Sequence, residues 1–244
     1  MDKRVPESEV PEGLNFIEYT TKAAEFVRER QPPPTESIRG TLTQMGTLLS
    51  LLDRLSSCWW GCTGGNHVLH YLVVRGCSNT VAGIQLTNLA FYDEALALAR
   101  NVAEVGNLLW LFAVDNNSID RWVKADRRER LRTFSPRAVR DAIEKCGAPL
   151  PIGQDTYSEL SEMATHVTPE INPQTHKAGE RPKTGGILYD ANAAERAIEH
   201  LALGLAVVGS GGCRVVPSPK EQFDRINKET IALIRRLGAS DVAA

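Results

Sequence analysis

Hydrophobic residues recur every three or four positions along most of the chain, which is the period of one face of an α-helix. After Thr35 the apolar positions are Ile38, Leu42, Met45, Leu48, Leu49, Leu52 and Leu55. We expect a helix there that ends near Gly61. Apolar and polar residues never alternate over a stretch long enough to indicate a β-sheet, although residues 213–216 are compatible with one short strand. The pattern therefore predicts an all-α protein, folded as a helical bundle or an irregular helical array.

Prolines divide the N-terminal part of the chain. An amphipathic pattern over residues 14–28 ends at Pro32–Pro34, because proline lacks an amide donor and fixes φ. The charged, proline-containing residues before it are typical of a mobile tail. We therefore expect a tail over 1–13, a helix and proline linker over 14–34, and a single helical domain over 35–244.

Glycines and prolines also punctuate the rest of the chain. Two or three helices fit the apolar residues up to position 114, with Gly76 or Gly83 as candidate interruptions. Ser118 is expected to cap a short helix, and Gly209–Gly212 to break a long one. A Pro/Gly-rich segment near the C-terminal third, residues 167–186, is expected to form a long loop. The helices expected after position 114 cover residues 118–122, 136–146, 155–165, 191–208 and 219–237.

Composition and charge describe an ordinary globular chain. Of 244 residues 42% are hydrophobic and 24% are charged, and the net charge of −2 indicates no particular partner. The five cysteines are odd in number and scattered, and no secretory leader is present, which favours a reducing cytoplasm. The longest apolar stretches are too short to span a bilayer, so no membrane association is expected.

A narrow polar stripe crosses the Ala/Leu-rich segment 91–114. Asp93, Arg100, Glu104 and Asn107 are spaced so that they share one helical face. One interpretation is the solvated side of an amphipathic helix, with an ordinary i,i+4 pair between Arg100 and Glu104. The other is a central helix whose stripe lines a pocket, with Asn107 among the ligand-binding residues.

Two histidines accompany hydroxyl groups in and beside the expected long loop. His166, Thr168 and His176 could approach the polar stripe if the loop folds back. Imidazole titrates near neutrality, so His166 would then be a catalytic acid or base beside Arg100 and Glu104. His176 and Thr168 would bind the ligand. Alternatively, His166 caps the preceding helix and His176 is an exposed loop residue.

One stretch of the chain is strongly basic. Between Arg121 and Arg140 eight basic residues face only two acidic ones. Such a patch attracts phosphate groups, although a solvated helical face whose arginines pair with acids elsewhere explains it equally well. The candidate phosphate-binding residues are Arg127, Arg128, Arg130 and Arg132.

A second group combines cysteine and histidine, the usual zinc ligands. It consists of Cys58, Cys62, His67, His70 and Cys77. The spacing matches no zinc pattern, and buried free cysteines are the simpler interpretation. We assign no metal there, and the sequence identifies no cofactor.

Three segments carry a resemblance to a known group. They are YDEALALARNVAE at 92–104, FSPRAVR at 134–140 and YSELSEMATHVTP at 157–169. Over residues 40–205 the chain resembles bacterial helical proteins related to the HEPN (higher eukaryotes and prokaryotes nucleotide-binding) group. This resemblance implies a helical bundle and a link to RNA or nucleotides. Ribonucleases of that group carry an arginine four to six residues before a histidine, whereas no arginine stands there before His166.

These observations leave three functions open, and they do not settle whether the chain is an enzyme. The first is a helical binding or regulatory protein that recognises RNA, a nucleotide or another phosphorylated ligand. The second is a phosphodiesterase or ribonuclease-like hydrolase in which His166 transfers protons and Arg100 stabilises phosphate charge. The third is a homo-oligomeric interaction module formed by the Ala/Leu-rich helices.

Overall fold

The computed structural model describes residues 13, 15–59, 61, 67–164 and 189–239. These residues form helices and connecting turns without any strand, which confirms the predicted all-α fold. None of the described helices is long and apolar enough to cross a membrane. The expected tail, except Gly13, and the expected long loop lie outside the described residues.

Capping side chains mark where several of the helices begin. Each of these side chains accepts a hydrogen bond from a first-turn amide that has no partner within its helix. The caps are Asn15, Thr35, Asp126, Ser135 and Asp190. The described helices are α1 (Phe16–Arg30), α2 (Glu36–Ser56), α3 (Val68–Asn88), α4 (Tyr92–Val114), α5 (Asn117–Lys124), α6 (Arg127–Thr133), α7 (Pro136–Lys145), α8 (Gln154–Ala164), α9 (Ala191–Val215) and α10 (Lys220–Arg236).

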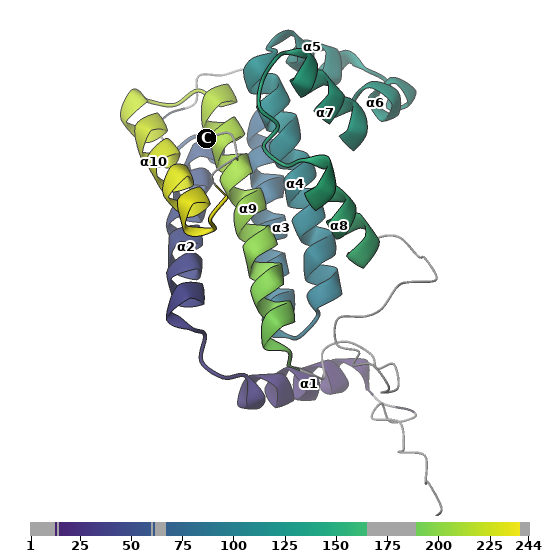
Figure 1. Cartoon of the computed structure of the whole chain (residues 1–244), viewed down its shortest axis with the longest axis vertical. Helices are drawn as coiled ribbons and strands as arrows, with labels where there is room; N and C mark the ends of the chain where they lie inside the picture. The colour runs from purple at the N-terminus through teal and green to yellow at the C-terminus, as the bar shows by residue number, and fades with distance from the viewer. Residues whose placement is uncertain (1–12, 14, 60, 62–66, 165–188, 240–244) are drawn as a thin grey trace, which may run out of the picture.

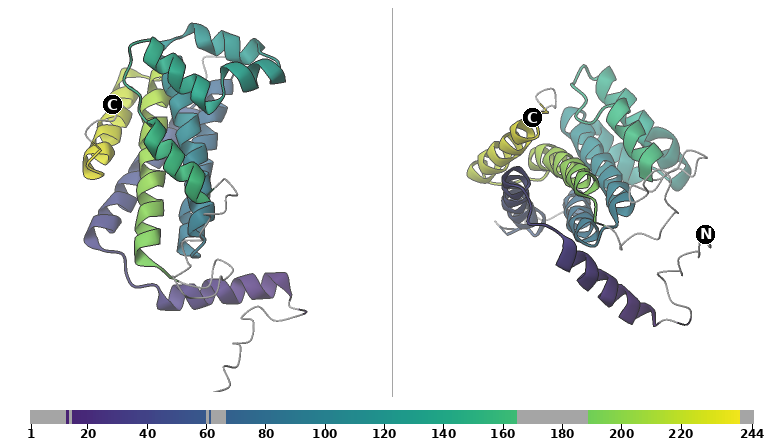
Figure 2. Two further views of the ribbon diagram at one scale, coloured as in Figure 1. Left: turned by 45° about the vertical axis from the view of Figure 1, so that its right-hand side comes forward. Right: turned by 60° about the horizontal axis from the view of Figure 1, so that its bottom comes forward.

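The long helices α2, α3, α4 and α9 run side by side, and α4 with α9 forms the most extensive contact (Figure 1). The main hydrophobic core lies among these helices and α10. Helix α1 lies across one end of the bundle, and α5, α6 and α7 gather at the opposite end (Figure 2). Helix α8 packs along α4. This position of α8 matters for the site, because it covers the polar stripe of α4.

Several expected helix ends are wrong. Helix α3 continues through Gly76 and Gly83, and α9 continues through Gly209–Gly212 to Val215. The expected short strand at 213–216 is therefore helical up to Val215. Helix α2 ends at Ser56, earlier than expected.

Close packing explains why these glycines do not break their helices. A Cβ atom on Gly211 would lie 2.8 Å from the backbone carbonyl carbon of Leu109 in α4. A Cβ atom on Gly76 would lie 2.8 Å from the side chain of Val208 in α9. Glycine costs a helix about 1 kcal/mol relative to alanine. Here the missing side chains let neighbouring helices approach, and the apolar burial that results offsets this cost.

Ser118 does not cap α5 as expected. It lies inside the helix, and its hydroxyl donates to Asp115 Oδ2 at 2.5 Å. Asp115 instead accepts from the Asn117 amide at 3.1 Å and pairs with Arg121 at 2.8 Å. The residue at the N-cap is Asn116, whose side chain makes no capping bond, and the Asp115 carboxylate accepts from the first amide of the helix.

Candidate functional site

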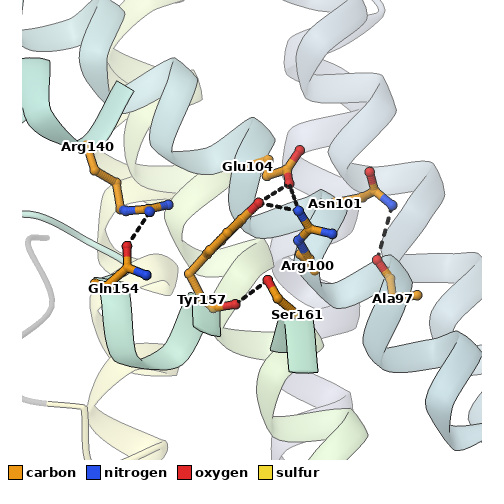
Figure 3. A network of polar contacts seen from close by, with 8 residues as sticks. All are labelled: Ala97, Arg100, Asn101, Glu104, Arg140, Gln154, Tyr157 and Ser161. Carbon is orange, nitrogen blue, oxygen red and sulfur yellow. Dashed lines mark hydrogen bonds and ion pairs between the residues drawn. The ribbon is translucent and has the colours of Figure 1, made fainter. Parts of the chain in front are cut away.

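A small cavity lies where α7 and α8 meet the polar stripe of α4. Its volume is about 170 Å³. Tyr157 of α8 lies at the centre of the polar contacts around it (Figure 3). The residues that line it are Glu104, Val105, Asn107, Leu108, Phe134, Pro136, Val139, Arg140 and Tyr157.

Arg100, Glu104 and Tyr157 form a hydrogen-bonded network. The i,i+4 spacing on α4 brings Arg100 Nη2 within 3.3 Å of Glu104 Oε1, as predicted. The Tyr157 hydroxyl donates to the same carboxylate oxygen at 2.8 Å and accepts from Arg100 Nη2. Burial raises the pKa of Tyr157, so its hydroxyl stays protonated and remains a donor. The Arg100 and Glu104 side chains are only 19% and 31% exposed.

Arg140 of α7 is a buried cation that pairs with no carboxylate among the described residues. Only 5% of it is exposed. Its Nη2 donates to Gln154 Oε1, whereas its Nη1 makes no hydrogen bond within the described part of the chain. Its guanidinium carbon lies 4.4 Å from the centroid of the Tyr157 ring. Arg100 lies over the same ring at 4.8 Å, and Figure 3 shows the two arginines on opposite sides of it.

The network has an excess of positive charge. Two guanidinium groups and one carboxylate leave one net positive charge among Arg100, Arg140 and Glu104. A cation–π contact contributes about 0.5–2 kcal/mol. Removing an ion from water costs several kcal/mol, even after the protein relaxes. The Tyr157 ring therefore offsets only part of the cost of burying Arg140, and an anion in the cavity would supply the missing partner.

Asn107 lines the cavity, but its side-chain amide already has partners. Its Nδ2 donates to the Ile152 carbonyl at 3.0 Å, and its Oδ1 accepts from the Ile152 amide at 3.3 Å. Trp110 Nε1 also donates to the Pro149 carbonyl at 3.0 Å. These bonds hold the segment between α7 and α8, and hence Tyr157, against α4. The ligand-binding role predicted for Asn107 stays a prediction.

The structure brings together only part of the predicted site. Arg100 and Glu104 are in contact, whereas His166, Thr168 and His176 lie outside the described residues. The predicted catalytic arrangement around His166 therefore stays untested.

The four arginines predicted to bind phosphate lie on α6, a short helix between α5 and α7. All four are exposed, and none forms an ion pair with a described residue. Arg130 Nη1 donates to the Ala125 carbonyl at 2.6 Å. Their exposure agrees with the alternative of a solvated helical face, and Arg121, Lys124 and Arg137 of the same stretch do pair with acids. Arg140, from the same basic stretch, is buried instead of solvated.

The cysteine and histidine group shows no metal site in the described part of the chain, although Cys62 lies outside it. Cys77 is buried in the main core, and burial raises the pKa of its thiol to about 12. The His67 and His70 rings lie 4.9 Å apart. Cys77 thus has the environment of a structural cysteine rather than of a thiolate ligand.

Sequence reasoning missed Arg140, Gln154 and Tyr157 as site residues. A signal was present for Arg140, because it lies on the same face of α7 as Val139 and Ile143, which are buried. A cation on an apolar helix face indicates a buried partner or a ligand. Tyr157 precedes the buried Leu160 and Ser161 by three and four positions, which likewise places it on the covered face of α8.

Comparisons with protein-family models, curated proteins and solved structures gave no significant match. The resemblance to HEPN-related proteins therefore remains a prediction. The function has to be argued from the geometry of the cavity.

Proposed function

We propose that this chain is a helical binding protein that takes a small phosphorylated ligand into the cavity between α4, α7 and α8. One observation carries the proposal: Arg140 is buried, it lines the cavity, and its Nη1 has neither a hydrogen-bond partner nor a carboxylate among the described residues. A phosphate oxygen would provide both a counter-charge and an acceptor. The planar guanidinium fork suits that geometry.

Two features support binding of an anion at this site. Gln154 and the Tyr157 ring hold the Arg140 guanidinium from two directions, so little side-chain entropy is lost when a ligand binds. The exposed arginines of α6 precede Phe134 and Pro136 of the cavity wall, and their positive potential would attract an anion from solution. In this proposal α6 raises the association rate, whereas Arg140 makes the specific contact.

The test is calorimetric titration with inorganic phosphate and ethyl phosphate at low ionic strength. Hydrogen bonds to charged groups contribute about 1.5–3 kcal/mol, so Arg140→Met should weaken binding by roughly 10-fold to 100-fold. Arg128→Met on α6 is the matched control, because it removes an exposed arginine and should change affinity far less. Thermal unfolding would verify that both variants fold. Unchanged affinity in Arg140→Met would rule the proposal out.

A further inference from the structure

The cavity has a second contact point, at Glu104. This carboxylate lines the cavity, and both Tyr157 and Arg100 contact its Oε1. In the described part of the chain its Oε2 makes no hydrogen bond, and the side chain is still 31% exposed. A free carboxylate oxygen accepts hydrogen bonds and attracts cations. The cavity therefore has an acceptor in Glu104 as well as a cation in Arg140.

We infer that the ligand is a small zwitterionic phosphomonoester, with its phosphate on Arg140 and a protonated amine on Glu104. The inference rests on the proposed function and specifies its ligand class. The charges support it. A phosphomonoester carries about −1.5 to −2 charges near neutral pH, so an added ammonium brings the ligand to about −0.5 to −1. This charge does not exceed the one net positive charge of Arg100, Arg140 and Glu104, whereas that of a simple phosphomonoester would.

The walls and size of the cavity restrict the part of the ligand between the two charged groups. Val105, Leu108 and Val139 are apolar and line the cavity together with Phe134. They favour a short hydrocarbon linker. The volume of about 170 Å³ is below the roughly 300–1,000 Å³ of sites for drug-sized molecules. A compact aminoalkyl phosphate fits these limits better than a nucleic acid chain.

The experiment compares two probes of similar shape. O-phosphoethanolamine has the phosphate and the amine, and ethyl phosphate has the phosphate alone. We expect the full chain to bind O-phosphoethanolamine about tenfold more tightly, which corresponds to about 1.4 kcal/mol. Glu104→Gln should remove this preference, because the neutral amide no longer attracts the ammonium, although it can still accept from Tyr157. Glu94→Gln, at an exposed position of the same helix, should keep the preference.

The outcomes separate the two proposals. Equal affinity for both probes, lost in Arg140→Met, would overturn the zwitterion inference and leave the phosphate site standing. A preference that persists in Glu104→Gln would also overturn it, because the amine would then contact another residue. Absence of binding by both probes would overturn the phosphate site itself. Tighter binding of a short single-stranded RNA than of either probe would replace the small-molecule ligand with nucleic acid.

Discussion

Helix α4 contacts α9 on one side and α7 and α8 on another, and only the second contact contains a buried polar network. The contact with α9 depends on glycines, which have no side chain and let the two helices approach closely. A Cβ atom on Gly106 would lie 2.8 Å from the Val207 side chain, and one on Gly204 would lie 2.8 Å from Val102. Toward α8 the contact includes the polar group of Arg100, Glu104 and Tyr157, and it leaves a cavity.

This difference shows how one helix supports both the fold and a binding site. On the α9 side a Cβ atom added to Gly106, Gly204 or Gly211 would meet neighbouring atoms at 2.8 Å, so added volume there is destabilising. On the α8 side, Arg140 Nη1 makes no hydrogen bond and Arg140 pairs with no carboxylate among the described residues. Close packing on the first side holds α4 in place, so that the polar side keeps a fixed geometry. Mutations on the two sides should therefore affect stability and binding differently.

The largest effect is expected at Gly211, in the contact between α9 and α4. In Gly211→Ala the new Cβ would lie 2.8 Å from the carbonyl carbon of Leu109 and the nitrogen of Trp110. Backbone atoms of a packed helix cannot move aside alone, so we expect a loss of about 1–3 kcal/mol in the free energy of unfolding. Gly46→Ala in α2 is the matched control. Its Cβ meets nothing within 4 Å, and the change should stabilise the protein by about 0.5–1 kcal/mol.

Urea denaturation of both glycine variants gives these values directly. Equal stability of Gly211→Ala and the parent protein would contradict the close approach of α9 to α4.

A smaller effect is expected at Tyr157, on the polar side of α4. Tyr157→Phe keeps the ring over Arg100 and Arg140 but removes the hydroxyl that bonds to Arg100 and Glu104. We expect a loss of about 1 kcal/mol in the free energy of unfolding. Tyr71→Phe is the control, because Tyr71 is 68% exposed on α3 and should tolerate the change. Denaturation curves that coincide for the two variants would mean that this network adds no stability.

Arg140→Met should leave stability within about 1 kcal/mol of the parent value, or raise it. The variant replaces a buried charge, which has no carboxylate partner in the described part of the chain, with an apolar side chain of similar length, and such replacements are often neutral or stabilising. The measurement is the melting temperature without ligand and with about 10 mM phosphate, because a ligand that binds only the folded state stabilises it. Phosphate should raise the melting temperature of the parent protein more than that of the variant. A large loss of stability in the absence of phosphate would instead indicate that Arg140 mainly supports the fold.

The smallest effect is a pH dependence at the contact between α8 and α9. Burial lowers the pKa of His200, although Glu159, whose Oε1 lies 3.9 Å from His200 Nε2, opposes this shift. The unfolded chain then binds a proton at higher pH than the folded chain. Stability should therefore be complete above about pH 6.5 and fall as the pH decreases through the range below it. His200→Gln should reduce this fall, as measured by the urea midpoint between pH 7 and pH 5.

His70→Gln is the comparison for the His200 experiment, since burial lowers the pKa of His70 too. An unchanged pH profile in His200→Gln would show that His200 contributes nothing to it.

Local sequence signals predicted the helical class, most of the helices and one part of the site. The starts at Thr35 and Ser135 follow from capping chemistry within three residues. The pair between Arg100 and Glu104 follows from one turn of helix. The expected break at Gly209–Gly212 was wrong, because the effect of a glycine depends on what packs against it.

The sequence by itself determined that the chain is helical and which polar residues share a face, because neighbours along the chain fix both. Only the tertiary structure decided that Tyr157 meets Glu104, since the two residues are 53 positions apart and each lies on a separate helix. It also decided that Arg140 is buried while the arginines of α6 are exposed. All of these arginines belong to one basic stretch. Burial depends on how α7 packs against α4, and the order of charges along the chain does not encode that packing.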